Sequence, residues 1–241
     1  MINEFSRLQL LLDDASFQKV QQSKVAIFGV GGVGGYVLEA LARAGVMHFA
    51  LIDNDDFSLT NLNRQILATH QSVGKNKVEV AKERILSINP HAEVKTYCQF
   101  YLPSEEPPIA FEEYDYIVDA IDTVTAKIDL ILKAKEAGKK IISSMGCGNR
   151  FDPSKLRLGD IYQTEMDPLA KVMRRELKKR GIKSCPVLYS LEKPTKPKKE
   201  NEEITKKTNV PGSSPFVPSV GGIMIAYWIF QDITGIKEPT C

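Results

Sequence analysis

Apolar segments of two kinds alternate along the first 145 residues of the chain. Residues 24–28 form a short run rich in β-branched side chains, and the apolar positions of 33–44 then recur at helical spacing until Gly45. The same change of period repeats along the chain, so we expect strands at 24–28, 49–52, 93–101, 114–121 and 139–145 and helices at 33–44, 78–88 and 123–137. Five strands that alternate with helices predict an α/β fold with a doubly wound, mainly parallel sheet and helices on both faces.

The segments on either side of this alternation predict an N-terminal helix and a C-terminal extension. Residues 1–23 carry apolar side chains at the spacing of one short amphipathic helix. The extension, 146–241, is expected to contain strands near 156–161 and 187–191, a basic helix at 168–180 and an apolar closing helix at 220–233. Prolines, lysines and glutamates without an apolar face occupy about 192–210, which predicts a mobile loop.

Composition allows one globular domain and disfavours several classes of protein. A chain of 241 residues, 43% of them hydrophobic, can bury one sheet core, so we expect a single domain over 1–241. The net charge of +2 argues against nucleic-acid binding over the whole surface. The four cysteines include no CxxC pair, which disfavours a structural zinc site. No signal-peptide pattern precedes the first strand, and the apolar run at 220–230 is too short to cross a bilayer. We therefore expect a cytoplasmic protein with no stable membrane insertion.

A glycine-rich turn typical of nucleotide sites follows the first predicted strand. Residues 29–34 have the spacing G-x-G-x-x-G, with a helix after them and Asp53 at the end of the second strand. Glycines here let the backbone approach a phosphate at the helix N-terminus, and the aspartate can accept hydrogen bonds from a ribose. The pattern predicts a nucleotide site in the half of the chain at 24–145, formed by Gly29, Gly31, Gly32, Gly34 and Asp53. It does not choose between NAD, FAD and ATP, and close packing of helix on strand without a ligand is the alternative.

Polar residues past the second and fourth strands favour a triphosphate. Asp55, Asn61 and Arg64 follow the second strand, at the edge where parallel sheets bind ligands. An arginine and amides there can hold phosphate oxygens, for which a hydride-transfer site has little use. Lys77 starts the next helix and is either a surface lysine or a phosphate ligand. Asp122 ends the fourth strand, where it caps the following helix, holds Mg²⁺, or does both.

The sequence allows two interpretations of Arg7, of the cations at 174–183 and of Cys185. Arg7 is either a solvated residue or an arginine delivered to a phosphate site, such as that of a neighbouring subunit. The cations at 174–183, interrupted by Glu176, form either a solvated face or a surface for phosphodiesters. Cys147 is interpreted as structural, and Cys185 as a buried thiol, with activation by a nearby lysine as the alternative.

These motifs, in this order, resemble the ATP-dependent adenylating enzymes related to MoeB, ThiF, HesA and the ubiquitin-activating enzymes. The resemblance rests on the glycine turn followed by D-x-D, NLNRQ, VGKNK and DAID, and it covers about 5–145. It implies a Rossmann-like fold, ATP and Mg²⁺ as cofactors, and a homodimer in which Arg7 crosses to the ATP of the other subunit. The residue roles it implies are phosphate binding by Gly31, Gly32 and Gly34, ribose binding by Asp53, triphosphate contacts from Asn61, Arg64 and Lys77 with Asp55 nearby, and Mg²⁺ binding by Asp122.

Beyond residue 145 the chain is similar to one branch of this family, the tRNA threonylcarbamoyladenosine dehydratases. The stretches FDPSKLRLGDI, TEMDPLAKVMRRELKKRGI and PGSSPFVP carry this similarity. The branch implies a modified tRNA as substrate, whose threonyl carboxylate is adenylated and then closes into a ring with loss of water. Arg64, Lys77, Arg7 and Mg²⁺ held by Asp122 would offset the charge on the phosphates, and no protein nucleophile is required.

Two other functions could use the same nucleotide site. One is adenylation of the C-terminus of a small ubiquitin-like sulfur-carrier protein. The other is a nucleotide-sensing or redox scaffold that binds NAD or ATP without turnover. Docking of a sulfur-relay protein from a cysteine desulfurase system and the role of the lysine-rich stretch 193–207 are left open.

Overall fold

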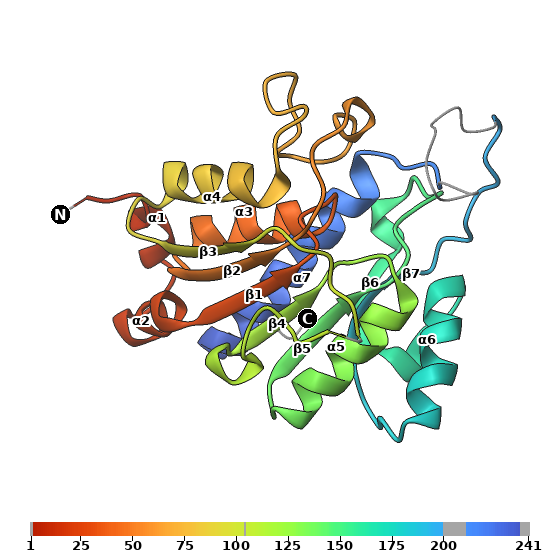
Figure 1. Ribbon diagram of the computed structural model, residues 1–241. Helices are drawn as coiled ribbons and strands as arrows, with labels where there is room; N and C mark the ends of the chain where they lie inside the picture. The colour runs from red at the N-terminus through yellow and green to blue at the C-terminus, as the bar shows by residue number, and fades with distance from the viewer. Residues whose placement is uncertain (1, 104, 200–210, 237–241) are drawn as a thin grey trace.

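The computed structural model describes residues 2–103, 105–199 and 211–236, and their strands form one seven-stranded sheet (Figure 1). The strands are β1 Lys24–Phe28, β2 His48–Ile52, β3 Glu93–Tyr97, β4 Tyr116–Asp119, β5 Lys140–Ser144, β6 Leu156–Asp160 and β7 Pro186–Ser190. Their order is β3-β2-β1-β4-β5-β7-β6, with β6 antiparallel to β7 and the other neighbouring pairs parallel. The prediction of a doubly wound, mainly parallel α/β sheet is confirmed.

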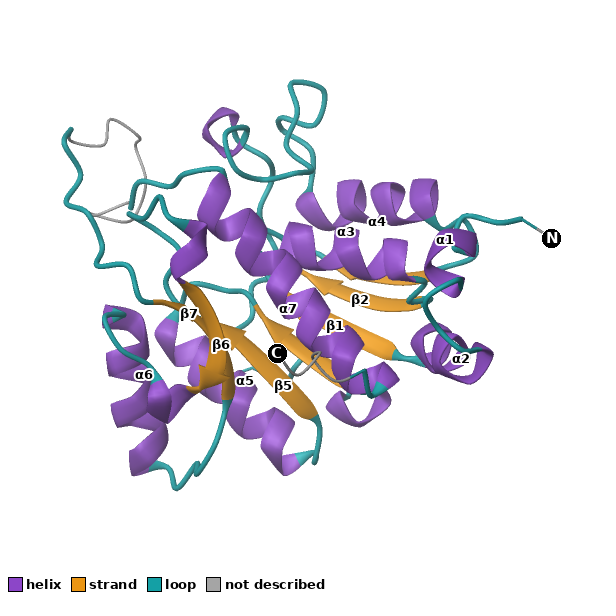
Figure 2. Ribbon diagram, turned by 180° about the vertical axis from the view of Figure 1, so that it is seen from behind, coloured by secondary structure: helices purple, strands orange, loops and turns teal. Residues whose placement is uncertain are grey.

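Helices cover both faces of this sheet (Figures 1 and 2). They are α1 Ser6–Gln9, α2 Asp14–Gln22, α3 Gly34–Ala44, α4 Lys77–Ile88, α5 Val124–Glu136, α6 Pro168–Lys179 and α7 Phe216–Thr234. Side chains of α3, α4 and α7 share one hydrophobic cluster, and those of α5 and α6 share another. Along β1, Val25 and Ile27 join the first cluster while Ala26 and Phe28 join the second. Strands buried on both faces in this way are typical of a parallel sheet between helix layers.

Two predicted strands are shorter in the structure because their sheet partners end. In the registers of β2 with β3 and of β1 with β4, Ile52 pairs with Tyr97 and Phe28 pairs with Asp119. After Phe28 the chain turns into the glycine loop, and after Ile52 it leaves the sheet. The predictions of strands over 93–101 and 114–121 were therefore too long.

The N-terminal segment forms two helices, so the prediction of one helix over 1–23 was wrong. Helix α2 has its own N-cap, because the side chain of Asp13 accepts a hydrogen bond from the amide of Ser16 at 2.6 Å. Leu10 and Leu11, between the helices, are each 79% exposed, whereas Phe5 packs on Phe17 with ring centroids 5.7 Å apart. The predicted apolar stripe is thus interrupted by a turn.

The apolar helix α7 begins earlier than predicted and packs into the core. Its 19 residues make it long and apolar enough to cross a membrane by length and composition. In the fold, however, Val217, Ile225 and Ile229 are buried in the cluster that α7 shares with α3. The structure thus favours the interpretation of α7 as a core helix.

Glu39 on α3 allows a prediction about acid stability. Its side chain is 9% exposed and accepts hydrogen bonds from Arg43 and Arg84 at 2.7–2.9 Å. Burial acts to raise the pKa of Glu39, but these guanidinium groups outweigh it and hold the pKa below the ordinary 4.5. We expect Glu39→Gln to lower the free energy of unfolding at pH 7 by about 1–3 kcal/mol.

Because the folded-state pKa is the lower one, this contribution is present above about pH 4.5 and is lost as the pH falls further. Urea denaturation of the wild type and the variant at pH 7 and pH 3 measures it. A difference between the two proteins that stays the same at pH 3 would contradict the assignment.

Candidate active site

The candidate site lies at the carboxyl ends of β1 and β4, where the chain order in the sheet reverses. From β1 the chain continues to β2 on one side, while β4 lies on the other side. In open α/β sheets such a point forms a crevice between two diverging loops. Here the loops touch, because a Cβ on Gly29, whose φ is +93°, would lie 2.7 Å from the carbonyl oxygen of Ala120. The glycine loop and the loop after β4 therefore border one crevice.

The four predicted glycines have two different roles. An added Cβ on Gly34 would lie 1.9 Å from the carbonyl oxygen of Gly29. Gly29 and Gly34 therefore allow close packing of the backbone. An added Cβ on Gly31 would meet its nearest neighbour, the amide nitrogen of the Gln65 side chain, at 4.0 Å. Gly32 lies beside Arg64, whose Cγ would be 3.6 Å from such a Cβ. An added Cβ on Gly32 would also meet the Cβ of Pro218, at 3.3 Å, so Gly31 is the position that leaves room along the loop for a ligand.

Asp53 directly follows β2 and contacts the start of the glycine loop, as the sequence predicts. Its Oδ2 accepts a hydrogen bond from the amide of Val30 at 2.7 Å, and its Oδ1 accepts one from the amide of Asp55 at 2.9 Å. Burial raises its pKa above the ordinary value, and the charge of Lys77 acts in the opposite direction. A carboxylate has about four acceptor positions, so two backbone donors leave capacity for a ribose hydroxyl.

Lys77 is buried in this site and is not a surface lysine. Its side chain is 7% exposed, and its ammonium lies 2.8 Å from Asp55 and 3.9 Å from Asp53. Asn76 caps the helix by accepting a hydrogen bond from the amide of Val78 at 3.2 Å, which begins α4 at Lys77. The partner Asp55 is 61% exposed, so the ion pair joins the buried lysine to a carboxylate at the surface.

Arg64 is held beside the glycine loop by its own helical turn. Its Nη1 donates hydrogen bonds to the carbonyl of Thr60 at 2.8 Å and to the side chain of Asn63 at 3.0 Å. Asn61 serves this turn, because its side-chain oxygen accepts the amide of Ser58 at 3.1 Å. The turn therefore holds Arg64 in place, with its aliphatic stem against Gly32. Asn61 stabilises this turn and so helps to position Arg64.

Gln65 is a site residue that the sequence reasoning missed. It is 7% exposed and faces Gly31, and its Oε1 has no hydrogen-bond partner among the described residues. A buried amide oxygen without a hydrogen-bond partner is unusual, and it occurs here at the open part of the glycine loop. The residue stands in NLNRQ directly after Arg64, and only the fold shows that its side chain turns inward.

Asp122 lies in the loop on the β4 side of the crevice. It is exposed, and it accepts a hydrogen bond from the hydroxyl of Thr123 at 3.4 Å. Its predicted role as N-cap is wrong, because α5 begins at Val124 with Thr123 in the cap position. Below the loop, Asp119 and Lys127 form an ion pair at 2.9 Å in which both side chains are fully buried. Lys127 also donates to the carbonyl of Ile121 at 3.1 Å, so this pair supports the loop.

Arg7 is far from the crevice of its own chain. Helix α1 lies at the end of α3 that is remote from the glycine loop, since Phe5 and Phe17 surround Gly45 at the C-terminus of that helix. An eleven-residue helix is roughly 16 Å long. The structure therefore brings Arg64, Lys77, Asp53 and Asp55 together with the glycine loop, but not Arg7.

Cys147 and Cys185, the described cysteines of the C-terminal extension, are structural, as expected. Cys185 is fully buried, and burial raises its pKa to about 12. Burial also raises the pKa of Cys147, beside Ser144, to about 11. Neither thiol has the lowered pKa of a nucleophile.

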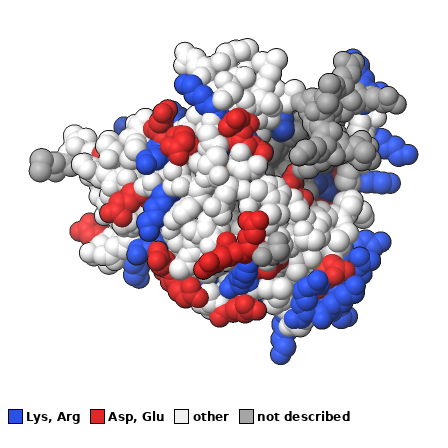
Figure 3. Space-filling model, in the orientation of Figure 1, with Lys and Arg blue, Asp and Glu red and all other residues white. Residues whose placement is uncertain are grey.

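The basic helix α6 is partly neutralised by its own side chains. Glu176 lies 2.9–3.2 Å from Arg175, Lys179 and Arg180, and hydrogen bonds led by that of Arg180 lower its pKa to about 2. Arg174 turns inward and donates to the carbonyl and hydroxyl of Thr164. A dense cationic patch nevertheless remains on the surface over α6 (Figure 3), with Lys171, Arg175, Lys178, Lys179, Arg180 and Lys183 exposed.

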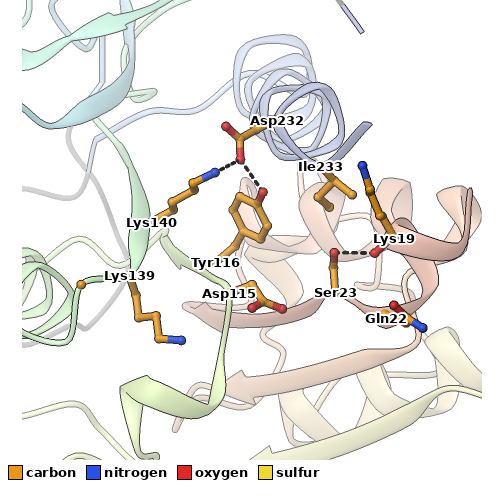
Figure 4. Close-up of a pocket in the computed structure, with 10 residues that line it drawn as sticks. Lys19, Gln22, Ser23, Asp115, Tyr116, Lys139, Lys140, Asp232 and Ile233 are labelled. Carbon is orange, nitrogen blue, oxygen red and sulfur yellow. Dashed lines mark hydrogen bonds and ion pairs between the residues drawn. The ribbon is translucent and has the colours of Figure 1, made fainter. Parts of the chain in front are cut away.

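A pocket of about 460 Å³ lies at the opposite edge of the sheet (Figure 4). It is lined by the starts of β4 and β5 and the ends of α2 and α7. The carboxylate of Asp232 accepts hydrogen bonds there from Tyr116 and Lys140. This pocket is at the amino ends of the strands and is separate from the crevice.

The chain was compared with protein families, with known sequences and with solved structures. The model of the ThiF family matches residues 5–241. The tRNA threonylcarbamoyladenosine dehydratase of Bacillus subtilis is 40% identical, with 97% of this chain and 95% of that protein covered. The enzyme of the same name from Haemophilus influenzae is 37% identical over 73% of this chain and 67% of its own. Crystal structures of the Escherichia coli enzyme with AMP and with ATP, both 28% identical, superpose with TM-scores of 0.85 and 0.84 and cover 96% of this chain and 94% of theirs.

Proposed function

Since this chain belongs to the ThiF family, we propose that it is an ATP-dependent tRNA threonylcarbamoyladenosine dehydratase. It would adenylate the threonyl carboxylate of the modified adenosine and close the substituent into a ring with net loss of water. The observation that carries the proposal is the crevice itself: an open glycine loop with Arg64, Lys77 and Asp53 converging on it. The similarity to known dehydratases supports the proposal, because it covers nearly the whole chain, including the extension beyond residue 145.

Each residue has a role that follows from its position. Gly31 and Gly32 let the backbone amides approach the phosphates at the N-terminus of α3. Arg64 and Lys77 would stabilise the charge that builds on the α-phosphate when a carboxylate oxygen attacks it and pyrophosphate leaves. Asp53 would accept hydrogen bonds from the ribose.

The site suits Mg²⁺ held mainly by the substrate. The described residues contain no group of three or more carboxylate, histidine or cysteine side chains that could hold an ion alone. A single exposed carboxylate, Asp122, fits the way Mg²⁺ binds through one or two protein oxygens, phosphates and water. Mg²⁺ bound there would supply charge neutralisation for the leaving pyrophosphate.

The ring closes without a protein nucleophile. Once the carboxylate carries AMP, a nitrogen of the same substituent can attack the acyl carbon, release AMP and lose its proton. Tethering makes this step intramolecular and fast. The burial of Cys185 agrees with this scheme and gives no support to sulfur transfer through that thiol.

Mass spectrometry of the tRNA tests the proposed activity. The protein is incubated with ATP, Mg²⁺ and tRNA that carries threonylcarbamoyladenosine, and the modified nucleoside is expected to lose the mass of one water. Pyrophosphate release that depends on a carrier protein ending in Gly-Gly, with the tRNA unchanged, would favour the alternative. ATP binding with neither reaction would favour a nucleotide sensor.

A homodimer would explain the position of Arg7, which is exposed and remote from its own crevice. In the proposed dimer Arg7 reaches the ATP of the other subunit. Mixing Arg7→Ala with Asp122→Asn, each nearly inactive alone, should then restore about a quarter of the wild-type activity, because half of the dimers would contain one intact site. An arginine that acts within its own chain would give no recovery on mixing.

The exposed cations of α6 are the proposed contact surface for the tRNA phosphates. Replacing Lys178 and Lys179 with glutamine should weaken tRNA binding and reduce its dependence on salt, while leaving ATP binding unchanged. Titrations at several salt concentrations measure this effect. Because the proposed substrate is a tRNA, we expect the protein to lie in the cytoplasm.

A further inference from the structure

A buried ion pair joins the carboxyl end of β5 to the start of α6. Arg150 is 2% exposed and Asp167 is 4% exposed, and Nη2 of the arginine lies 3.3 Å from Oδ2 of the aspartate. The same carboxylate caps α6, because its Oδ1 accepts the amides of Leu169 and Ala170 at 2.9 and 3.1 Å. Its Oδ2 accepts the amide of Gly146 at 3.1 Å. One carboxylate therefore holds both the basic helix and the turn after β5.

The guanidinium of Arg150 also binds a third segment, which follows β7. Nη1 donates to the carbonyl of Gly146, and Nε donates to the carbonyl of Glu192 at 2.9 Å, just after β7. The carboxylate of Glu192 in turn accepts the amides of Phe151 and Asp152 at 2.9–3.1 Å. The fork of one arginine thus ties together the turn at 146–150, the N-terminus of α6 and the end of β7.

The backbone beside each partner is in an unusual conformation. Among the described residues, the non-glycine residues with positive φ are Asn149, at 60°, and Met166, at 53°, and each directly precedes a member of the pair. Asn149 is held from both sides, donating its amide to the carbonyl of Gly212 and accepting the amide of Thr195, each at 2.7 Å. Such conformations persist where the surroundings impose them, and they concentrate at functional sites.

Stability alone does not account for this arrangement, because buried ion pairs are seldom more stabilising than apolar side chains of the same volume. Its place in the fold suggests a different benefit. The turn at 146–150 leaves β5 at the carboxyl edge of the sheet, next to β4 and the loop of Asp122. Helix α6 carries the exposed cations. The pair therefore links the turn after β5 to the helix that carries the proposed tRNA surface.

We propose that Arg150 and Asp167 are positioning residues that fix α6 relative to the crevice, so that the bound tRNA presents its carboxylate to the α-phosphate. The inference rests on the proposed function for its substrate. The geometry requires the arginine fork, because a lysine at position 150 could not reach Gly146, Asp167 and Glu192 together. Adenylation is sensitive to such placement, since an error of 1 Å can lower a rate by about 10²-fold.

The test compares Arg150→Met and Arg150→Lys with Glu39→Gln, which disturbs a buried charge cluster on α3 instead. For each protein we would measure the melting temperature, the affinity for ATP and kcat/KM for the modified tRNA, well below the melting temperature. We expect Arg150→Met to lower kcat/KM for tRNA by about 10²-fold with ATP affinity within twofold of the wild type. Arg150→Lys should recover little, and Glu39→Gln should leave both values unchanged.

Equal losses of ATP affinity and tRNA turnover, or turnover within twofold of the wild type in Arg150→Met, would overturn the proposal. If Arg150→Met does not fold, Asp167→Asn decides in its place, because asparagine still caps a helix but lacks the charge. Hydrogen exchange gives a readout independent of turnover: the amides at 146–150 and in the first turn of α6 should exchange faster in the variants, while those of β1 and β2 should not. Unchanged exchange at α6 overturns the inference, whereas a wild type that protects α6 but does not convert tRNA overturns the proposed function.

Discussion

Replacing Arg64 with alanine is expected to lower kcat/KM for the dehydration of the modified tRNA by about 10²–10³-fold. Arg64 lies against Gly32 at the open part of the glycine loop, and its turn holds it there through the carbonyl of Thr60. A preorganised cation at that place stabilises charge that develops only as the phosphate is attacked, so the loss should appear mainly in kcat. Single-turnover measurements with saturating ATP would show it.

Arg43→Ala is the matched control, because Arg43 belongs to the last turn of α3, at the other end of that helix from the glycine loop. It should retain the activity of the wild type. Arg64→Lys should fall between the two, since an ammonium keeps the charge but not the fork that binds two oxygens. If Arg64→Ala converted tRNA as fast as Arg43→Ala, the triphosphate could not lie where we place it.

Replacing Lys127 with methionine is expected to destabilise the protein by about 3–5 kcal/mol, because it leaves the carboxylate of Asp119 buried without its countercharge. Both side chains are fully buried, at 2.9 Å, and the hydroxyl of Ser143 donates to the same carboxylate at 2.5 Å. Urea denaturation at pH 7 measures the change. Asp119→Leu combined with Lys127→Met should recover most of the loss, since an apolar pair leaves no charge uncompensated.

The control for this prediction is the exposed pair of Lys140 and Asp232, whose side chains are 55% and 33% exposed. Lys140→Met should cost no more than about 1 kcal/mol, because water screens the charges of an exposed pair. Equal losses for Lys127→Met and Lys140→Met would mean that burial does not decide the strength of the inner pair.

Much of the site could be predicted because its residues follow strand ends in an α/β alternation. Strands at 24–28, 49–52 and 139–145 and the glycine turn can be recognised from local periodicity, and carboxyl ends of parallel strands meet at one edge. Asp53 and Arg64 therefore needed no knowledge of contacts to be placed at the crevice. The roles given to them, ribose binding by Asp53 and a triphosphate contact by Arg64, remain predictions.

The sequence by itself determined the class of the fold and the family to which the chain belongs, and it predicted where the candidate nucleotide site lies. It could do so because these depend on the spacing of residues close in the chain. Only the tertiary structure decided that Lys77 is buried against Asp55, that Gln65 faces the glycine loop, and that Arg7 lies at the far end of α3. The same holds for Arg150 and Asp167, 17 residues apart in number and joined by an ion pair that no local pattern specifies. Whether a charged side chain is solvated or paired depends on segments distant in sequence, and packing alone brings those segments together.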